Sequence, residues 1–125
     1  MSATSVSSRH ARLDVLLDGL RITRSASDAA RRHTERVLVL EWDEVAGATL
    51  ELTGKGRSIV RVAVVGPHAV DDHRDDPYAV KAGRDQAESA VAVVDRINEE
   101  AATRRRWHEQ AATTPPVDDG AVEAG

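Results

Sequence analysis

LDVLLDGLRIT, the segment from Leu13 to Thr23, decides the fold class of this chain. Apolar residues at positions 13, 15 and 17 precede Asp18-Gly19, and apolar residues at 20 and 22 alternate with polar ones after it. An Asp-Gly pair between two alternating runs indicates a β-hairpin, because a type I′ turn needs positive φ at both central positions. We therefore predict two antiparallel strands joined by a tight turn.

Outward from this hairpin, four more segments have the pattern of strands. The run Arg36–Trp42 is apolar at consecutive positions, so we expect a strand that is covered on both faces. Residues 48–53 and 60–64 alternate on either side of Gly54–Gly56 and predict a second hairpin. Residues 78–82 predict one more strand, which brings the expected total to about six.

Two polar segments connect these strands. Residues 25–35 are rich in Ala and Arg and predict a loop or one short helical turn. Residues 66–77 predict a polar loop with room for a very short strand. Trp42, at the end of a strand, is expected in the core with its indole N–H bonded to a carbonyl.

The segment after Gly83 has the period of an amphipathic helix. Asp85 and Glu88 have the spacing of a capping box. Apolar residues recur at spacings of three and four, namely Ala87, Ala90, Val91, Val94, Ile97 and Ala101. We expect a helix from about Gln86 to Gln110.

Length and composition indicate one domain with polar ends. Residues 1–11 predict a disordered lead, residues 12–110 the β-rich domain with its helix, and residues 113–125 a disordered acidic tail. Apolar residues make up 41% of the chain, and the absence of Phe, with two Trp and one Tyr, makes the core aliphatic.

Charge and composition exclude or disfavour several functional classes. A net charge of −4 argues against bulk attraction to DNA or to an anionic membrane. The chain has no Cys, so disulfides and thiolate chemistry are excluded. No apolar run has the length of a membrane span, and the N-terminus lacks the apolar core of a secretory signal, so we expect a cytoplasmic protein. No phosphate loop or nucleophile elbow is present, so we expect no enzymatic activity and no cofactor.

The order of hairpin, loop, strands and final helix resembles the pleckstrin-homology-like superfold in its small bacterial form. The segments 16–23, 40–50 and 78–91 carry this resemblance. It implies an α+β fold in which an antiparallel β-sandwich, or partly open barrel, of about six strands is capped by one C-terminal helix. That family usually has seven strands, so a chain with six would expose a sheet edge and invite strand addition or dimerisation.

Basic residues near the first two hairpins predict one candidate ligand site. A pocket for an anionic ligand or lipid headgroup would use Arg21, Arg24, Lys55 and Arg57. Eukaryotic members of this family that bind phosphoinositides use basic residues around the first hairpin loop. That loop is tight and acidic here and lacks a phosphate cradle, so the lipid-binding role is not transferred to this chain.

A second basic cluster lies near the end of the expected helix. Arg104, Arg105 and Arg106 precede Trp107, and the four residues are a candidate interaction surface. The alternative is that these cations only complement the helix dipole. Nucleic-acid binding would require this cluster to converge with Arg31 and Arg32.

The polar loop of residues 66–77 offers three weak candidates for metal binding, namely His68, Asp72 and His73. Their spacing matches no metal motif, and a solvated loop is the simpler interpretation.

The leading functional hypothesis is a protein-interaction module that binds a protein partner or itself. An anionic-ligand binder is the first alternative and a nucleic-acid-associated regulator the second.

Overall fold

The computed structural model describes residues 4–66 and 72–113. They form two antiparallel sheets and a long C-terminal helix, without closing into a barrel. The first sheet has the order β1-β2-β3-β4, with bounds Ser5–Ser7, Ala11–Val15, Gly19–Arg24 and Val37–Glu41. The second has the order β5-β6-β7, with bounds Val45–Leu52, Ser58–Val64 and Ala79–Lys81. The helices are α1 (Ala26–Arg31), the 3₁₀ turn η1 (Trp42–Glu44) and α2 (Ala87–Thr113).

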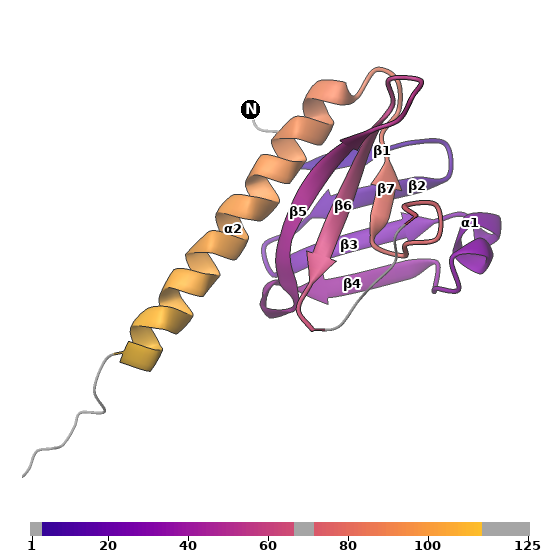
Figure 1. The fold of residues 1–125 in the computed structure, drawn as a ribbon. Coiled ribbons are helices and arrows are strands. Elements are labelled where there is room, and N and C mark those ends of the chain that lie inside the picture. The colour runs from indigo at the N-terminus through magenta and orange to yellow at the C-terminus, as the bar shows by residue number, and fades with distance from the viewer. Residues whose placement is uncertain (1–3, 67–71, 114–125) are drawn as a thin grey trace, which may run out of the picture.

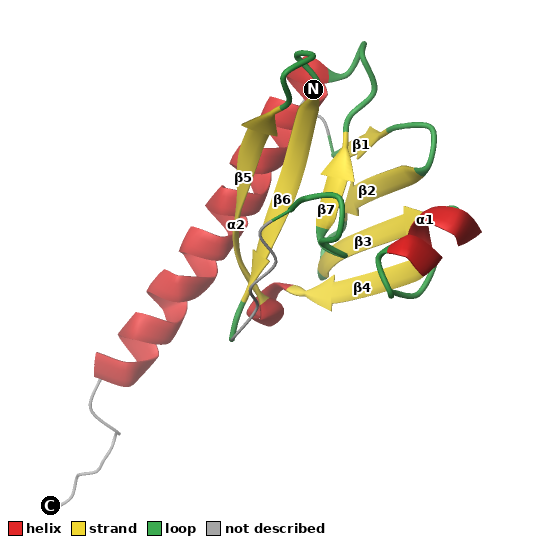
Figure 2. Ribbon diagram, turned by 45° about the vertical axis from the view of Figure 1, so that its right-hand side comes forward, coloured by secondary structure: helices red, strands yellow, loops and turns green. Residues whose placement is uncertain are grey.

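The two sheets pack with their strands crossing steeply, and α2 lies along β5 (Figures 1 and 2). This arrangement confirms the expected α+β class with antiparallel strands and a C-terminal helix. The helix begins and ends close to the predicted bounds. Within the described residues, no helix is long and apolar enough to cross a membrane.

Seven strands are described, where the sequence predicted about six, and the additional strand is β1. It lies inside the segment that we expected to be disordered, so that expectation is wrong for Ser5–Ser7. Val6 pairs with Leu13 of β2 and is 1% exposed, so a single apolar side chain holds the strand in the core. Three residues are too few to display a period of two.

The first hairpin is confirmed, but the reason for its glycine is different. Val15 pairs with Leu20, and the Leu16 N–H donates to the Gly19 carbonyl at 2.7 Å. Gly19 belongs to β3 and does not have positive φ. Instead, a Cβ at this position would collide with the backbone carbonyl of Leu40 on β4. The glycine therefore permits close approach of two strands.

The expectation that β4 is covered on both faces is wrong. Leu40 is buried, but Val37 and Val39 are 51% and 58% exposed. The run is apolar at successive positions, yet β4 lies at the edge of its sheet and nothing described packs on its outer face. Trp42, just after it, is buried as expected, and its indole N–H donates to the Leu17 carbonyl at 3.0 Å.

The helix α2 buries a narrow face made of Ala90, Val93, Val94, Ile97 and Ala101. Ala87 and Val91 were expected in this face but are exposed. The residue before the helix is Gln86 rather than the predicted cap Asp85, and the Gln86 side chain accepts the Ser7 N–H at 2.8 Å.

The polar connections are only partly described. The segment 25–35 contains the short helix α1, within the expected alternatives. Residues 67–71, where a short strand was considered, lie outside the described residues. The predicted tail also lies outside them, except for Thr113, which is the last residue of α2.

Candidate functional site

On three of the four outer strands, another part of the fold occupies at least one outward backbone group. Along β5, the Asn98 side chain bonds to both the N–H and the carbonyl of Ala48, at 2.8 and 3.0 Å. At β1, the Ser7 carbonyl accepts the Gly83 N–H at 2.8 Å. At β7, Arg24 donates to the Ala79 carbonyl at 2.6 Å. These contacts occupy backbone groups that would otherwise be free to pair with another strand.

At the edge of β4 a side chain likewise occupies one group, since the Glu41 N–H donates to Glu44 Oε1 at 2.9 Å. The Arg24 N–H donates to the Arg36 carbonyl and the Trp42 N–H to the Asp18 carbonyl, so even-numbered residues of β4 direct their backbone groups toward β3. Val37 and Val39 therefore direct their N–H and C=O groups outward. Within the part of the chain that the structure describes, no group covers them. The side chains of both valines are also exposed.

The four predicted anion-binding residues do not form one site. Lys55 and Arg57 line a pocket beside the β5–β6 hairpin, as expected. Arg21 lies elsewhere and contacts Asp14 at 3.4 Å. Arg24 is 3% exposed and bonds to Asp28 and to the carbonyls of residues 77 and 79, so it has no surface available for a ligand.

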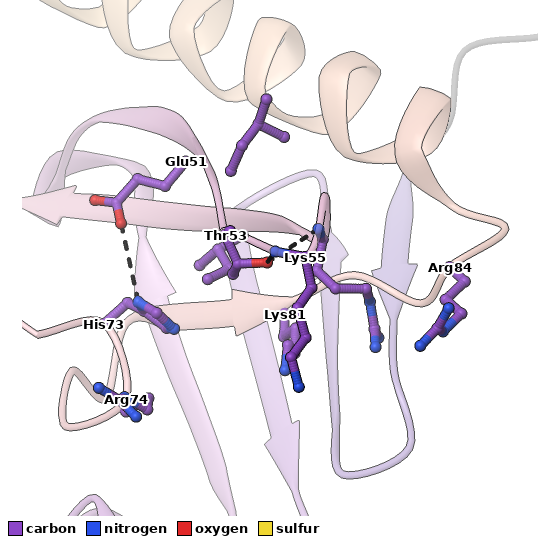
Figure 3. Close-up of a pocket in the computed structure, with 11 residues that line it drawn as sticks. Glu51, Thr53, Lys55, His73, Arg74, Lys81 and Arg84 are labelled. Carbon is purple, nitrogen blue, oxygen red and sulfur yellow. Dashed lines mark hydrogen bonds and ion pairs between the residues drawn. The ribbon is translucent and has the colours of Figure 1, made fainter.

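The pocket contains basic residues that the sequence did not indicate. Arg74, Lys81 and Arg84 line it together with Lys55 and Arg57. Figure 3 shows Glu51 and His73 facing each other, with Lys55, Lys81 and Arg84 around the same hollow. These side chains come from residues 51–84, but β-sheet pairing, and not sequence spacing, places them together.

A buried ionic cluster joins α1 to the segment before β7. Asp28 accepts hydrogen bonds from Arg24 at 2.8 Å, Arg31 at 3.0 Å and Arg32 at 3.0 Å. Arg32 also donates to the carbonyls of His73 and Asp76, at 2.6 and 2.7 Å. Arg31 and Arg32 are thus engaged within the fold. Among the described side chains, Arg24 Nε is a buried nitrogen without a hydrogen-bond partner.

The predicted surface at Arg104–Trp107 is exposed, and its residues belong to α2, before the last turn of the helix. Trp107 is 62% exposed, and the Arg104 guanidinium lies 5.7 Å from the centre of its ring. Because α2 continues to Thr113, the three arginines are not in its last turn, so the helix-end explanation for them is wrong. Arg105 donates to the Ala46 carbonyl at 2.9 Å, which fastens this part of the helix to β5.

The weak metal candidates are only partly described. His68 lies outside the described residues. Asp72 accepts hydrogen bonds from the backbone and side chain of Arg74, which lower its pKa, and its Oδ1 lies 3.9 Å from His73 Nδ1. Burial lowers the pKa of His73. In residues 4–66 and 72–113, no group of three His, Cys, Asp or Glu side chains is arranged to hold a metal ion.

Compared with protein-family models, curated proteins and solved structures, the chain matches none.

Proposed function

We propose that this chain is a non-enzymatic protein-interaction module of the pleckstrin-homology-like type, and that the β4 edge is its binding surface. The family assignment is supported by the order of a four-stranded sheet, a three-stranded sheet and a C-terminal helix packed against both. That order is what the sequence resemblance implies. The order of elements does not by itself assign an enzymatic activity, because one fold supports many functions and the function depends on the site.

The observation that carries the proposal is a pair of apolar, exposed residues on β4, Val37 and Val39, whose outward backbone groups have no partner among the described residues. Each of the other outer strands has backbone groups occupied by a side chain or a neighbouring backbone group. Val37 and Val39 have neither cover nor a charged side chain, whereas the third outward-facing residue, Glu41, is charged and donates its N–H to the Glu44 carboxylate. An extended strand added here would gain main-chain hydrogen bonds together with apolar contacts.

A second copy of the chain is the occupant that this edge fits. In an antiparallel pair centred on Val39, that residue faces its own counterpart, and Leu38 of one copy faces Leu40 of the other. Val37 then faces Glu41, so no like charges oppose each other within the strand. The edge is therefore self-complementary in this arrangement.

This interface is small, because a five-residue strand provides it. We therefore expect association that depends on protein concentration rather than a permanent dimer. Light scattering across a range of concentrations should show the mass rising from 13.5 kDa toward twice that value. A mass of 13.5 kDa at every concentration would remove the self-association.

The substitution Val39→Lys tests whether β4 is the contact. It places two like charges opposite each other on the axis of the pair, so the mass should stay at that of one chain. The matched control is Val65→Lys, because Val65 is also exposed, at 65%, and lies outside β4. If Val39→Lys still dimerises, the contact is elsewhere. If the wild-type chain binds an extended peptide of unrelated sequence but does not dimerise, the partner of β4 is another protein.

A further inference from the structure

The pocket beside the β5–β6 hairpin concentrates positive charge in an acidic chain. It is an open cavity of about 580 Å³ lined by residues of β5, β6, β7 and the turn that contains His73. Among the described residues, five Lys and Arg side chains line it, but only one acidic side chain does, namely Glu51. Such segregation raises the local concentration of an anionic ligand.

Both lysines of the chain are in this pocket. Lys55 is on the hairpin and Lys81 is at the end of β7, and the sequence has no other lysine. Arg84 approaches from the segment that leads to α2 (Figure 3). Among the described residues, these three cations have no hydrogen-bond or ion-pair partner. Their charges are therefore free to contact a ligand.

The remaining polar groups leave the pocket positive. Glu51 accepts a hydrogen bond at 2.9 Å from Arg61, which is outside the lining and also pairs with Asp76, so its charge is partly compensated. Arg57 donates to the Ala82 carbonyl at 3.0 Å, which fixes the guanidinium in place. Burial lowers the pKa of His73, which disfavours the charged form of its ring.

We infer that this pocket binds a small ligand carrying at least two phosphate groups. Lysine ammonium and arginine guanidinium groups are the side chains that recognise phosphate oxygens. The free cations Lys55, Lys81 and Arg84 come from three separate segments. A single phosphate group would therefore leave at least one of them without an anionic partner. The cavity volume is in the range of small-molecule sites rather than of a single ion.

The lining indicates recognition through the phosphates. Leu52 and Ile59 provide apolar surface, and His73 is the only ring among the lining residues that is available to stack on a base. The site is distant in the chain from the first hairpin, where Arg21 is paired and Arg24 buried. The inference does not depend on the β4 edge and goes beyond the proposed protein interaction.

Calorimetric titration with sodium tripolyphosphate and with inorganic phosphate, at matched ionic strength, tests the ligand class. Tripolyphosphate should bind about tenfold or more tightly than phosphate, because it reaches more cations, and its affinity should fall as salt rises. Equal affinity for the two anions, or no binding of tripolyphosphate at low salt, would overturn the inference.

The double variant Lys55→Ser/Lys81→Ser tests the location. Both lysines are exposed, so their removal should leave the fold intact and weaken tripolyphosphate binding by about tenfold or more. The control Arg104→Ser/Arg106→Ser removes the same charge from α2, outside the pocket, and should retain wild-type affinity. An equal loss in both variants would mean bulk attraction and would refute the site.

Two further measurements test where the ligand binds and whether its phosphates belong to a lipid or to a free small molecule. Tripolyphosphate should protect both lysines from acetylation, read by mass spectrometry, and no protection would contradict the site. Sedimentation with phosphatidylcholine vesicles containing phosphatidylinositol bisphosphate would assign the phosphates to a lipid headgroup. Tripolyphosphate binding without such sedimentation would assign them to a free small molecule. Equal binding to phosphatidylserine vesicles would mean that surface charge alone is recognised, which contradicts the inference.

Discussion

Asp28 is the carboxylate on which the buried ionic cluster of Arg24, Arg31 and Arg32 depends. Burial alone would raise its pKa, but hydrogen bonds from Arg24, Arg32 and Arg31 outweigh that effect and lower it from 3.8 to about 2. Burial in turn lowers the pKa of Arg24, whose guanidinium is tied to Asp28 and to β7. One carboxylate thus satisfies cations that would otherwise be costly to bury.

The depressed pKa of Asp28 predicts acid-sensitive stability. Because the folded protein holds the carboxylate ionised, its contribution is complete above about pH 5 and is lost as the pH falls toward 2. The loss should amount to about 2 kcal/mol in the free energy of unfolding, measured by urea denaturation at a series of pH values. Asp28→Asn should cost about 3–5 kcal/mol at pH 7 and flatten this dependence. Asp95→Asn, at an exposed site, is the control, and an equal effect there would contradict the argument.

The strand β4 has two kinds of backbone N–H groups, and they alternate along it. Those of Leu38 and Leu40 bond within the sheet, whereas those of Val37 and Val39 face outward. On the other outer strands, Asn98, Arg24 and Gln86 each occupy outward backbone groups of one residue. A substitution in β4 should therefore affect either pairing with a second chain or the stability of the fold, depending on which N–H group it removes.

Proline substitutions in β4 separate pairing from stability. Val39→Pro removes an outward N–H, so the protein should fold with nearly wild-type stability but remain at the mass of one chain. Leu38→Pro removes an N–H that bonds to β3 and should lower the free energy of unfolding by about 2 kcal/mol or more. Urea denaturation and light scattering measure the two effects. If both variants lose equal stability, the assignment of outward and inward groups is wrong.

The helix α2 joins the two sheets into one core. Its buried residues share a cluster with Leu13 and Ile22 of the first sheet and with Val60 and Val80 of the second. Ile97, in the middle of this face, is completely buried, while Val91 on the same helix is 46% exposed. Packing by the helix is therefore what allows two sheets that do not close into a barrel to exclude water.

Truncation of the helix face should unfold the protein as a unit. Ile97→Ala leaves a cavity between both sheets and should cost about 2–5 kcal/mol in the free energy of unfolding. Val91→Ala removes a partly solvated side chain and should change it by less than about 1 kcal/mol. The midpoint of urea denaturation, followed by circular dichroism and by Trp fluorescence, gives both values. Similar costs for the two variants would show that the helix does not hold the core.

The sequence by itself determined the hairpins, the C-terminal helix and the burial of Trp42, because alternation of period two and a spacing of three to four are local properties. Local pattern also predicted two of the pocket residues, Lys55 and Arg57, which share one hairpin. It failed for β1, where three residues show no period, and for β4, where an apolar run was taken as covered on both faces.

Only the tertiary structure decided which cations are free and which are buried. Arg24 and Lys81 look alike as isolated basic residues, yet one is enclosed by α1 and β7 and the other lines an open pocket. The same holds for the sheet edges, since Asn98 covers Ala48 across 50 residues of sequence. Contacts between segments far apart in the chain depend on how sheets pair and pack, and no local periodicity encodes that.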